Sequence, residues 1–377
     1  MAAPATGESA LDRTDARMIS ADSHILERPD MWEKPLKARY GDAVPHCFDE
    51  FNGEKGRFWY SGRQVLRLGG EDSEHRGDEL LRRAGYEPEA RVEFQKKARV
   101  AAEVLYPTFG MVVMRAKDHA ALKASAEVYN DWLREYFSYD PERLWGVAII
   151  PPVDVPWAVG ELERSLANGF RSVMINCRNP EGMPRYRDPV YDPFWARAAE
   201  IGVPITLHPL TGQIPDPFHP ETREQEGEAA LWAIDQFNEI QGTLAADFIF
   251  GGVLDRHPAL KIVCSEFEIS WLRYFSWRID QLQVGLSKRM PVMAIALERA
   301  SDYLRRNTWH GWIDDGWGAD AIDVLTADRV MWGSDFPHVR SVALDAQSEV
   351  GAMLAGLPVA DRHKILAANV AEVYRLH

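Results

Sequence analysis

Four side chains that can bind a metal ion follow short apolar segments of the sequence. Asp22 and His24 come directly after the first such segment, His208 ends a second, and Asp335 follows the last after a Gly-Ser step. Side chains two residues apart on a strand point to the same side, so Asp22 and His24 can face one site. Carboxylates and imidazoles suit divalent zinc or manganese. The pattern therefore predicts a metal site if the fold brings these segment ends together.

Each position also has a simpler explanation when it is taken alone. Asp22 and His24 could serve a turn or a cap, His208 could be a hydrogen-bonded core histidine, and Asp335 could begin a helix. The conjunction of Asp and His residues at three strand ends is what favours a functional site.

Glu266 is a further candidate because it follows the apolar run 261–264. The pKa of a carboxyl in such a place rises through burial or falls beside a cation, depending on which effect dominates. The structural alternative is an ion pair with Arg273 or Arg278 on the segment that follows.

The elements that must position these residues alternate along the chain. Short apolar runs predict buried parallel strands, and longer stretches with helical period separate them. The predicted strands are Met18–Ala21, Val104–Tyr106, Leu144–Ile150, Ser172–Ile175, Pro204–Leu207, Lys261–Cys264, a weaker Arg305–Trp309, and Val330–Trp332. The predicted helices include Asp118–Phe137, Trp157–Asn168 and Phe194–Ile201. Eight strand–helix units favour a distorted (β/α)8 TIM barrel, while an open doubly wound sheet is the alternative, although no GxGxxG follows a strand.

We expect residues 1–16 to be a flexible N-terminus and residues 17–377 to form one barrel domain. An inserted segment at 41–95 interrupts the alternation and contains a predicted hairpin around Ser61-Gly62. A second insertion spans about 211–228. Loops that follow barrel strands build the active-site face, so the 41–95 segment is predicted to cover the barrel mouth as a lid. Surface decoration is the alternative for both insertions.

Composition limits the classes of protein that the chain can be. It has 377 residues, with 43 Lys and Arg against 57 Asp and Glu, a formal net charge of −14 that disfavours nucleic acid or an anionic membrane as partner. The 46% hydrophobic content allows a sizeable core and excludes wholesale disorder. No apolar run approaches the ~18 residues of a membrane span, and the first residues do not resemble a secretory signal. The three cysteines form no disulfide framework, so we expect a cytoplasmic protein.

Several residues are candidates for contact with a small-molecule substrate. Arg178 and Arg340 follow predicted strands and could each hold a substrate carboxylate, although surface ion pairs would also explain them. His338 closes the run W-G-S-D-F-P-H beside Asp335. Trp59, in the predicted hairpin, could reach the pocket or simply pack in the core.

The sequence resembles the amidohydrolase-related (amidohydrolase 2) family of the amidohydrolase superfamily. The resemblance runs from about Met18 to Tyr374 and is carried by I-S-A-D-S-H, L-H-P, D-R-H-P-A-L-K-I-V, R-V-M-W-G-S-D-F-P-H and I-L-A-A-N-V-A-E-V-Y. The family includes decarboxylases similar to amino-carboxymuconate semialdehyde decarboxylase and the resorcylate decarboxylases. The resemblance implies one divalent metal ion, usually zinc or manganese, with Asp22, His24, His208 and Asp335 as its ligands. It also implies a homodimer.

One departure from the family shapes the expected reaction. Family decarboxylases usually carry a histidine where this chain has Glu266. Two like unit charges ~4 Å apart repel by about 4 kcal/mol at an effective dielectric constant of 20, so an ionised Glu266 disfavours an aromatic acid.

We therefore expect metal-dependent hydrolysis of a small cyclic or aromatic compound by a metal-activated water, with Asp335 as proton acceptor and Glu266 as second acid or base. Non-oxidative decarboxylation of an aromatic or muconate-type acid is the first alternative, with Asp335 protonating the ring carbon. A catalytically silent metal-binding scaffold is the second.

Overall fold

The computed structural model describes residues 18–62, 64–68, 78–212, 226–286, 295–338 and 346–374, with side chains omitted at 226–233. The N-terminal segment 1–16, most of the second insertion and Arg340 lie outside the described residues.

Eight parallel strands form the (β/α)8 barrel that the sequence predicts. Their order in the sheet is their order in the chain, and each strand pairs in parallel with the next. The strands are β1 (Met18–His24), β5 (Val100–Tyr106), β6 (Leu144–Ile149), β7 (Ser172–Met174), β8 (Pro204–Leu207), β9 (Lys261–Cys264), β10 (Thr308–Trp312) and β11 (Val330–Trp332).

The seam between β11 and β1 closes through backbone bonds just beyond β11. The N–H of Asp335 donates to the carbonyl of Asp22 (2.9 Å), and the N–H of His24 donates to the carbonyl of Phe336 (2.6 Å). Gly333 permits this approach, because a Cβ at that position would lie 2.6 Å from the Cβ of Asp22.

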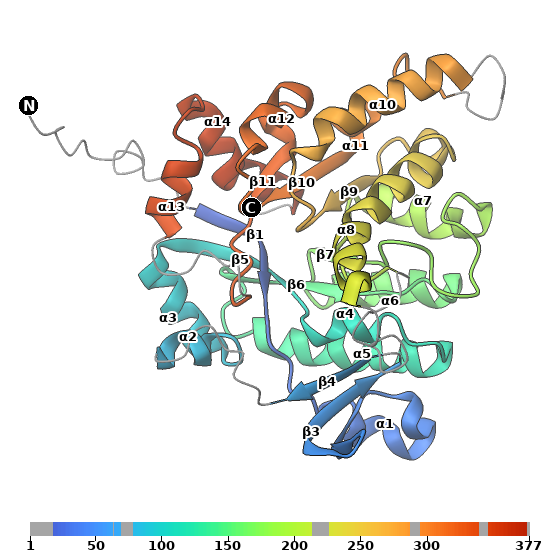
Figure 1. The fold of residues 1–377 in the computed structure, drawn as a ribbon, viewed down its shortest axis with the longest axis vertical. Helices are drawn as coiled ribbons and strands as arrows, with labels where there is room; N and C mark the ends of the chain where they lie inside the picture. Colours follow the sequence, from blue (N-terminus) through green and yellow to red (C-terminus); the bar gives the residue numbers. More distant parts are fainter. Residues whose placement is uncertain are drawn as a thin grey trace, which may run out of the picture.

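Helices surround the strands (Figure 1). They are α1 (Glu33–Tyr40), α2 (Glu79–Ala84), α3 (Pro88–Ala98), α4 (Phe109–Val113), α5 (His119–Phe137), α6 (Val155–Ala167), α7 (Asp192–Ile201), α8 (Glu226–Thr243), α9 (Val253–Arg256), α10 (Trp271–Leu286), α11 (Asp302–Asn307), α12 (Gly318–Leu325), α13 (Ala346–Met353), α14 (Val359–His363) and α15 (Asn369–Val373). Short 3-10 turns lie at 41–43, 189–191 and 327–329, and π-helical turns at 244–249 and 364–368.

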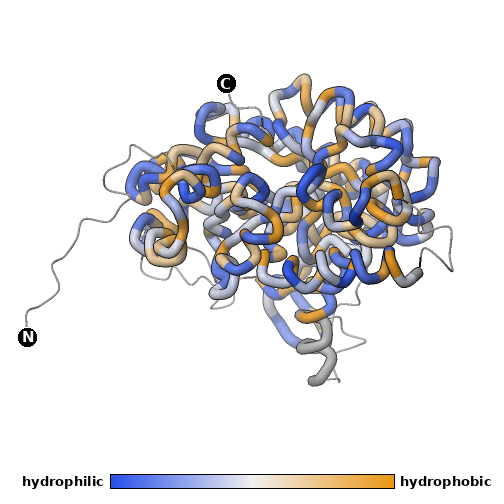
Figure 2. The backbone as a smooth tube through the Cα atoms, turned by 90° about the horizontal axis from the view of Figure 1, so that it is seen from above, coloured by the Kyte–Doolittle hydropathy of each residue, from blue (hydrophilic) through white to orange (hydrophobic). Residues whose placement is uncertain are grey.

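The long outer helices follow ordinary capping and packing rules. The carboxylate of Asp118 accepts hydrogen bonds from the N–H groups of Ala120 and Ala121, which begins α5 one residue after the predicted start. Asp154 caps α6 in the same way through Trp157. Hydrophilic and hydrophobic residues are mixed along the coiled stretches of the chain, as expected of helices with one face against a barrel (Figure 2).

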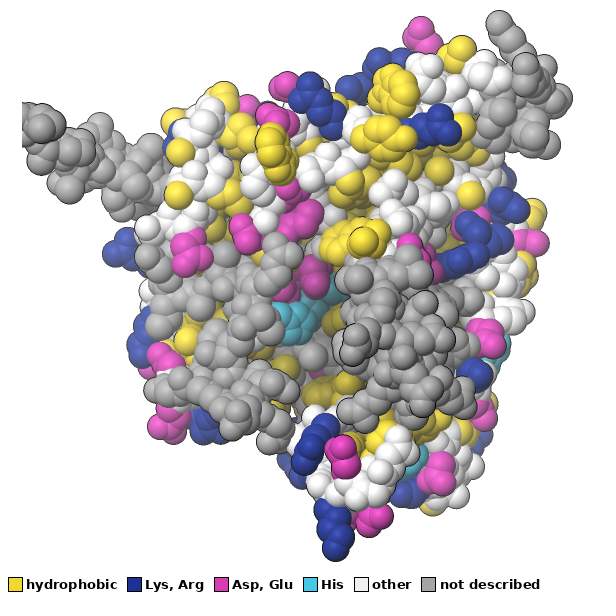
Figure 3. Space-filling model, in the orientation of Figure 1, with side chains coloured by type: hydrophobic (Ala, Val, Ile, Leu, Met, Phe, Trp, Pro, Cys, Tyr) yellow, Lys and Arg dark blue, Asp and Glu magenta, His cyan; other side chains and the backbone are white. Residues whose placement is uncertain are grey.

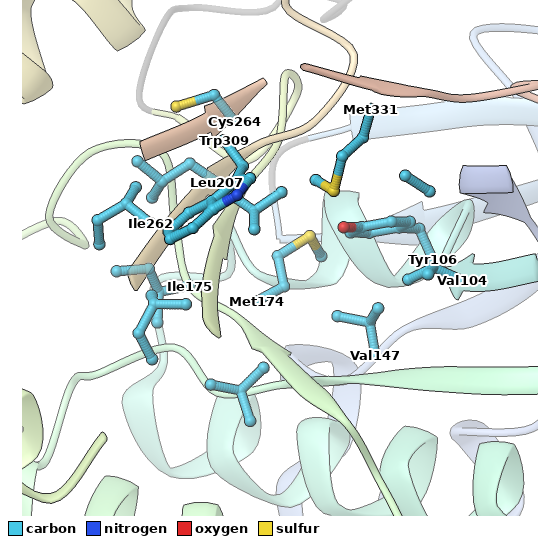
Figure 4. Packing of buried hydrophobic residues seen from close by; sticks show 14 of the residues in the cluster. Val104, Tyr106, Val147, Met174, Ile175, Leu207, Ile262, Cys264, Trp309 and Met331 are labelled. Carbon is cyan, nitrogen blue, oxygen red and sulfur yellow. The ribbon is translucent and has the colours of Figure 1, made fainter. Parts of the chain in front are cut away.

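Apolar side chains fill the centre of the barrel. Tyr106, Met174 and Met331 come from three different strands, are fully buried and point toward one another (Figure 4). Layers of side chains from successive strands make a TIM barrel a packed core rather than a pore, so only groups at the strand ends meet a substrate.

The predicted lid segment consists of two separate parts. One is an antiparallel sheet of β2 (His46–Phe51), β3 (Glu54–Ser61) and β4 (Gln64–Leu68), whose last two strands form the predicted hairpin, at the lower edge of Figure 1. Trp59 of this sheet packs on Phe109 of α4, which follows β5, so the sheet lies toward the C-terminal ends of the strands. The other part, α2 with α3, lies beside β5. Whether either part covers a substrate stays a prediction.

Several strand bounds differ from the predictions by one to four residues. β8, β9 and β11 have the predicted bounds, whereas β5 begins four residues earlier and includes the fully buried Glu103. β10 begins at Thr308 because α11 occupies residues 302–307, part of the predicted 305–309 strand.

Among the helices that the structure describes, none is long and apolar enough to cross a membrane. α10 exposes Tyr274 and Trp277 at 63% and 56%. The homodimer stays a prediction.

Candidate metal centre

Five acidic and imidazole side chains converge at the C-terminal ends of β1, β8, β9 and β11. His24 Nε2 lies 3.4 Å from Asp22 Oδ1, 3.5 Å from Glu266 Oε2 and 3.4 Å from Asp335 Oδ1. His208 Nε2 lies 3.1 Å from Glu266 Oε2 and 3.8 Å from Asp22 Oδ2. Histidine and acidic side chains lie together near the centre of one face of the molecule (Figure 3). The fold thus brings together all four predicted ligands and Glu266.

The atoms that face the middle of this cluster are buried without hydrogen-bond partners among the described residues. They are Asp22 Oδ1, His24 Nε2, His208 Nε2 and Glu266 Oε2. Buried polar atoms are nearly always paired, and leaving one unpaired costs about 1–3 kcal/mol. One ligand atom from each of these four residues lies within 4.8 Å of the others. Two carboxylate oxygens and two imidazole nitrogens at this spacing fit a divalent cation.

The opposite atoms of the same side chains are held in place. His24 Nδ1 lies 2.8 Å from the carbonyl of Pro107, which fixes that nitrogen as a donor and leaves Nε2 to face the cluster. Ser265 Oγ donates to Asp22 Oδ2 (2.9 Å). His208 Nδ1 lies 3.1 Å from the carbonyl of Pro209. Outer partners of this kind orient metal ligands in known sites.

Asp335 belongs to a second, overlapping group with His338. His338 Nδ1 lies 2.8 Å from Asp335 Oδ1, and its Nε2 lies 3.2 Å from Thr108 Oγ1. Its ring stacks on His24 at 4.0 Å between centroids. This second group also contains His24 and Glu266. One ligand atom from each of its four residues lies within 4.8 Å of the others. Asp335 is therefore placed both to bind an ion and to exchange a proton with His338, whose side chain is 25% exposed.

Glu266 and Asp335 both have left-handed backbone conformations, with φ of +60° and +53°. Such a conformation costs a non-glycine residue about 1–3 kcal/mol and is found preferentially at functional sites.

The loops that follow β9 and β10 hold one another through two carboxylates. Glu268, which also has a left-handed φ of +56°, accepts hydrogen bonds from the N–H groups of Ile313 (3.1 Å) and Asp314 (3.2 Å). In return, Asp315 Oδ2 accepts from the N–H groups of Ile269 (3.2 Å) and Ser270 (2.6 Å). This exchange fixes the loop that carries Glu266.

Charges within the cluster shift the pKa of its members in opposite directions. Burial alone would lower the pKa of His208, but the charges of Glu266 and Asp22 raise it to about 9. Burial would also lower the pKa of His24. Contacts with Asp22 and Glu266 outweigh this effect and raise that pKa well above its usual value. The same contacts lower the pKa of Asp22, and lower that of Glu266 well below its usual range, despite burial. Burial and the negative charge of Glu266 raise the pKa of Asp335.

The predicted substrate contacts are not all near this cluster. Arg178 is exposed and lines a separate hollow of about 280 Å³ with Arg185 and Glu239, and no cluster residue lines that hollow. Trp59 is fully buried, and its described ring contacts are with Trp32 and Phe109. His338 alone of the described candidates lies in the cluster. The roles of Arg178, Trp59 and Arg340 stay predictions.

Three residues at the site, Ser265, Thr108 and Tyr106, were not predicted from the sequence. Ser265 stands one residue before Glu266 and supports Asp22, and the ring of Tyr106 lies 5.3 Å from that of His208. A serine and a threonine in loops carry no distinguishing pattern. For Tyr106 the sequence did offer a signal, because the residue ends a predicted strand and shares a strand face with Val104, two residues earlier.

Comparison with known proteins identifies the family. The model of the amidohydrolase family matches residues 46–376, so the chain belongs to this family. Its enzymes form part of the amidohydrolase superfamily that the motifs resemble.

Particular relatives are similar over most of the chain. Gamma-resorcylate decarboxylase of Polaromonas sp. (strain JS666 / ATCC BAA-500) is 29% identical over 277 residues, which cover 70% of this chain and 80% of that protein. The structure of an amidohydrolase from Mycobacterium avium subsp. paratuberculosis K-10 has a TM-score of 0.74 at 22% identity and covers 97% of this chain and 99% of its own. A dihydroxybenzoic acid decarboxylase from Polaromonas sp. JS666, solved with manganese and 2-nitroresorcinol, has a TM-score of 0.64 at 20% identity, covering 96% and 97%. The two structures confirm the barrel.

The cluster geometry predicts that His208 is needed to hold a metal ion. His208→Ala removes one of the four converging atoms and leaves Glu266 Oε2 without its nearest cationic neighbour, so metal content should fall strongly. Elemental analysis of protein purified under identical conditions measures this, with the buried His310→Ala, outside both ligand groups, as the matched control. Full metal occupancy in His208→Ala would contradict the ligand assignment.

The raised pKa values predict that metal binding competes with protons. With a pKa of about 9, His208 carries a proton at pH 7 in the metal-free protein, and His24 does too, yet each must lose it to bind a metal through Nε2. Affinity should therefore rise from pH 6 to pH 8, by about one to two decades per pH unit. Titration calorimetry with Mn²⁺ in buffers of different ionisation enthalpy measures both the affinity and the protons released. Affinity that does not change with pH would show that the imidazoles are not ligands.

Proposed function

We propose that this protein is a metal-dependent non-oxidative decarboxylase of an aromatic hydroxy acid. The observation that carries the proposal is the cluster itself. In it, four ligand atoms without hydrogen-bond partners in the described part of the chain lie beside an Asp335–His338 pair that can supply a proton. The similarity to gamma-resorcylate decarboxylase over most of both chains supports it. That relative favours the decarboxylase alternative over the hydrolysis that Glu266 suggested.

The position of Glu266 removes the electrostatic objection to an acidic substrate. Its Oε2 points at His208 and His24 rather than standing alone beside the substrate site. The charges of Asp22 and Glu266 would balance those of one divalent ion, and a protonated Asp335 would add none. An aromatic carboxylate would then approach a centre without net negative charge, so the repulsion expected from sequence does not arise.

Asp22, His24, His208 and Glu266 would hold the metal ion, which when bound would orient and polarise the oxygens of the acid. Imidazole favours zinc and carboxylate tolerates manganese, and the manganese-containing relative structure makes both ions worth testing.

Asp335 would supply the proton of the reaction. Its O–H would donate to the ring carbon that bears the carboxylate, the carbon–carbon bond would break, and its electron pair would return to the ring as carbon dioxide leaves. A C–H bond thus replaces the C–C bond, and Asp335 is left ionised. The partly exposed His338, 2.8 Å from Asp335 Oδ1, would return a proton from solvent.

Asp335→Asn tests the proton donor, because an amide keeps the shape but cannot supply an acidic proton. We expect kcat on dihydroxybenzoates to fall by about 10²–10⁴ while metal content stays near that of the wild type. Product formation in D2O, followed by mass spectrometry, should place one deuterium on the ring of the wild-type product. The exposed Asp323→Asn, on α12 and outside the loops after β9 and β10, is the control and should keep its turnover. An Asp335→Asn enzyme with undiminished turnover would exclude this role.

Glu266→Gln separates the two reactions considered from the sequence. If Glu266 is a ligand, the neutral amide should weaken Mn²⁺ binding by at least about tenfold and lower turnover with it. Hydrolysis assisted by Glu266 predicts instead a lower kcat on a neutral ester or lactone with metal occupancy unchanged. Glu142→Gln, exposed and at the opposite end of the barrel, is the control. Unchanged Mn²⁺ affinity in Glu266→Gln would refute its place in the ligand set.

A further inference from the structure

We propose that Arg91 is a positioning residue that clamps the β1 and β11 sides of the metal site together across the barrel seam. This inference rests on the proposed metal centre. Arg91 lies on α3, within the segment predicted as a lid, and is fully buried.

The guanidinium of Arg91 binds both chain segments that meet at the seam. Its Nη1 donates to the carbonyl of His24 (2.7 Å), and its Nη2 donates to the carbonyl of Phe336 (3.4 Å). His24 contributes a candidate ligand at the end of β1, and Phe336 directly follows Asp335. The face of the guanidinium also lies 4.7 Å from the centre of the Phe336 ring, which stacks on Phe94 of the same helix.

The charge of Arg91 is neutralised away from the metal site. Its Nε donates to Glu103 Oε2 (2.6 Å) and its Nη2 to Glu103 Oε1 (3.2 Å). Gln95 and Ser23 also donate to this carboxylate, at 2.7 and 3.0 Å. Arg91 therefore offers the site no free charge and acts on it through the backbone.

This clamp adds hydrogen bonds at the junction between β1 and the end of β11. β1 pairs with β5 along its length, whereas its junction with the end of β11 consists of scattered bonds. They include the backbone bonds Asp335 N–H to Asp22 and His24 N–H to Phe336, and a bond from the Ser334 N–H to Ser20 Oγ (2.8 Å). The carbonyl of Phe336 thus receives donors from both His24 and Arg91. Losing Arg91 would loosen the spacing of 3.4 Å between His24 Nε2 and Asp335 Oδ1. Lysine cannot replace it, because one ammonium cannot span two carbonyls and a bidentate carboxylate.

The test uses Co²⁺ added to the metal-free full chain, because its visible absorption reports coordination geometry. Two variants are compared with the wild type. Arg91→Lys keeps the charge, and the paired Arg91→Met with Glu103→Gln removes both charges, so that no buried ion is left unpaired. Arg164→Lys is the control, since the 36% exposed Arg164 also makes a bidentate pair with a carboxylate, that of Glu161 on α6, away from the site.

Both Arg91 variants should fold, bind Co²⁺ about 10–100-fold more weakly, and show altered absorption bands, while Arg164→Lys keeps the wild-type spectrum. Folded Arg91 variants with wild-type affinity and spectrum would overturn the role of Arg91 and leave the metal centre standing. If both variants fail to fold while Arg164→Lys folds, Arg91 is a structural residue and the proposal is wrong. A wild-type chain that binds no Co²⁺ would overturn the metal centre itself, and this inference with it.

Discussion

Buried charge of one sign must be balanced by charge of the other, and this requirement governs the site. Asp22 and Glu266 each direct one carboxylate oxygen, Oδ1 and Oε2, at buried imidazole nitrogens. Without a metal, protons on His24 and His208 provide the balance, which is why their pKa values rise. A divalent ion can take the place of these two protons without any change in the total charge of the cluster. The same arrangement thus explains the shifted pKa values, the unpartnered atoms and the choice of residues.

The barrel serves this requirement by placing each group at a strand end and holding its other side rigidly. Pro107, Ser265 and Gly333 have no charge to contribute, yet they respectively fix the ring of His24, orient Asp22 and let β11 approach β1. The strained backbone at Glu266 and Asp335 persists because neighbouring hydrogen bonds hold it. Stability and function therefore meet at the seam, where a polar network replaces part of the ladder.

The sequence was sufficient for the barrel, for three strands with their bounds, and for the convergence of Asp22, His24, His208 and Asp335. Apolar runs of parallel strands and the residues at their ends are local patterns. The sequence also predicted Glu266 at the same barrel mouth. That its Oε2 would be one of the metal-facing atoms was not predictable, because this depends on a left-handed turn two residues beyond β9. Arg91 and Glu103 were missed for a related reason. Arg91 lies in the segment interpreted as an insertion, and Glu103 directly precedes a predicted apolar strand. Neither residue shows from its own sequence surroundings that it forms a buried ion pair with the other.

The exchange of carboxylate bonds between Glu268 and Asp315 makes the loops after β9 and β10 a single mechanical unit. One of these loops carries Glu266, and the other begins at the end of β10 beside it. Natural divergence or laboratory design that alters the β10 loop would therefore also alter the metal environment. Grafting a new substrate preference onto this barrel requires the two loops to be exchanged together, as one cassette.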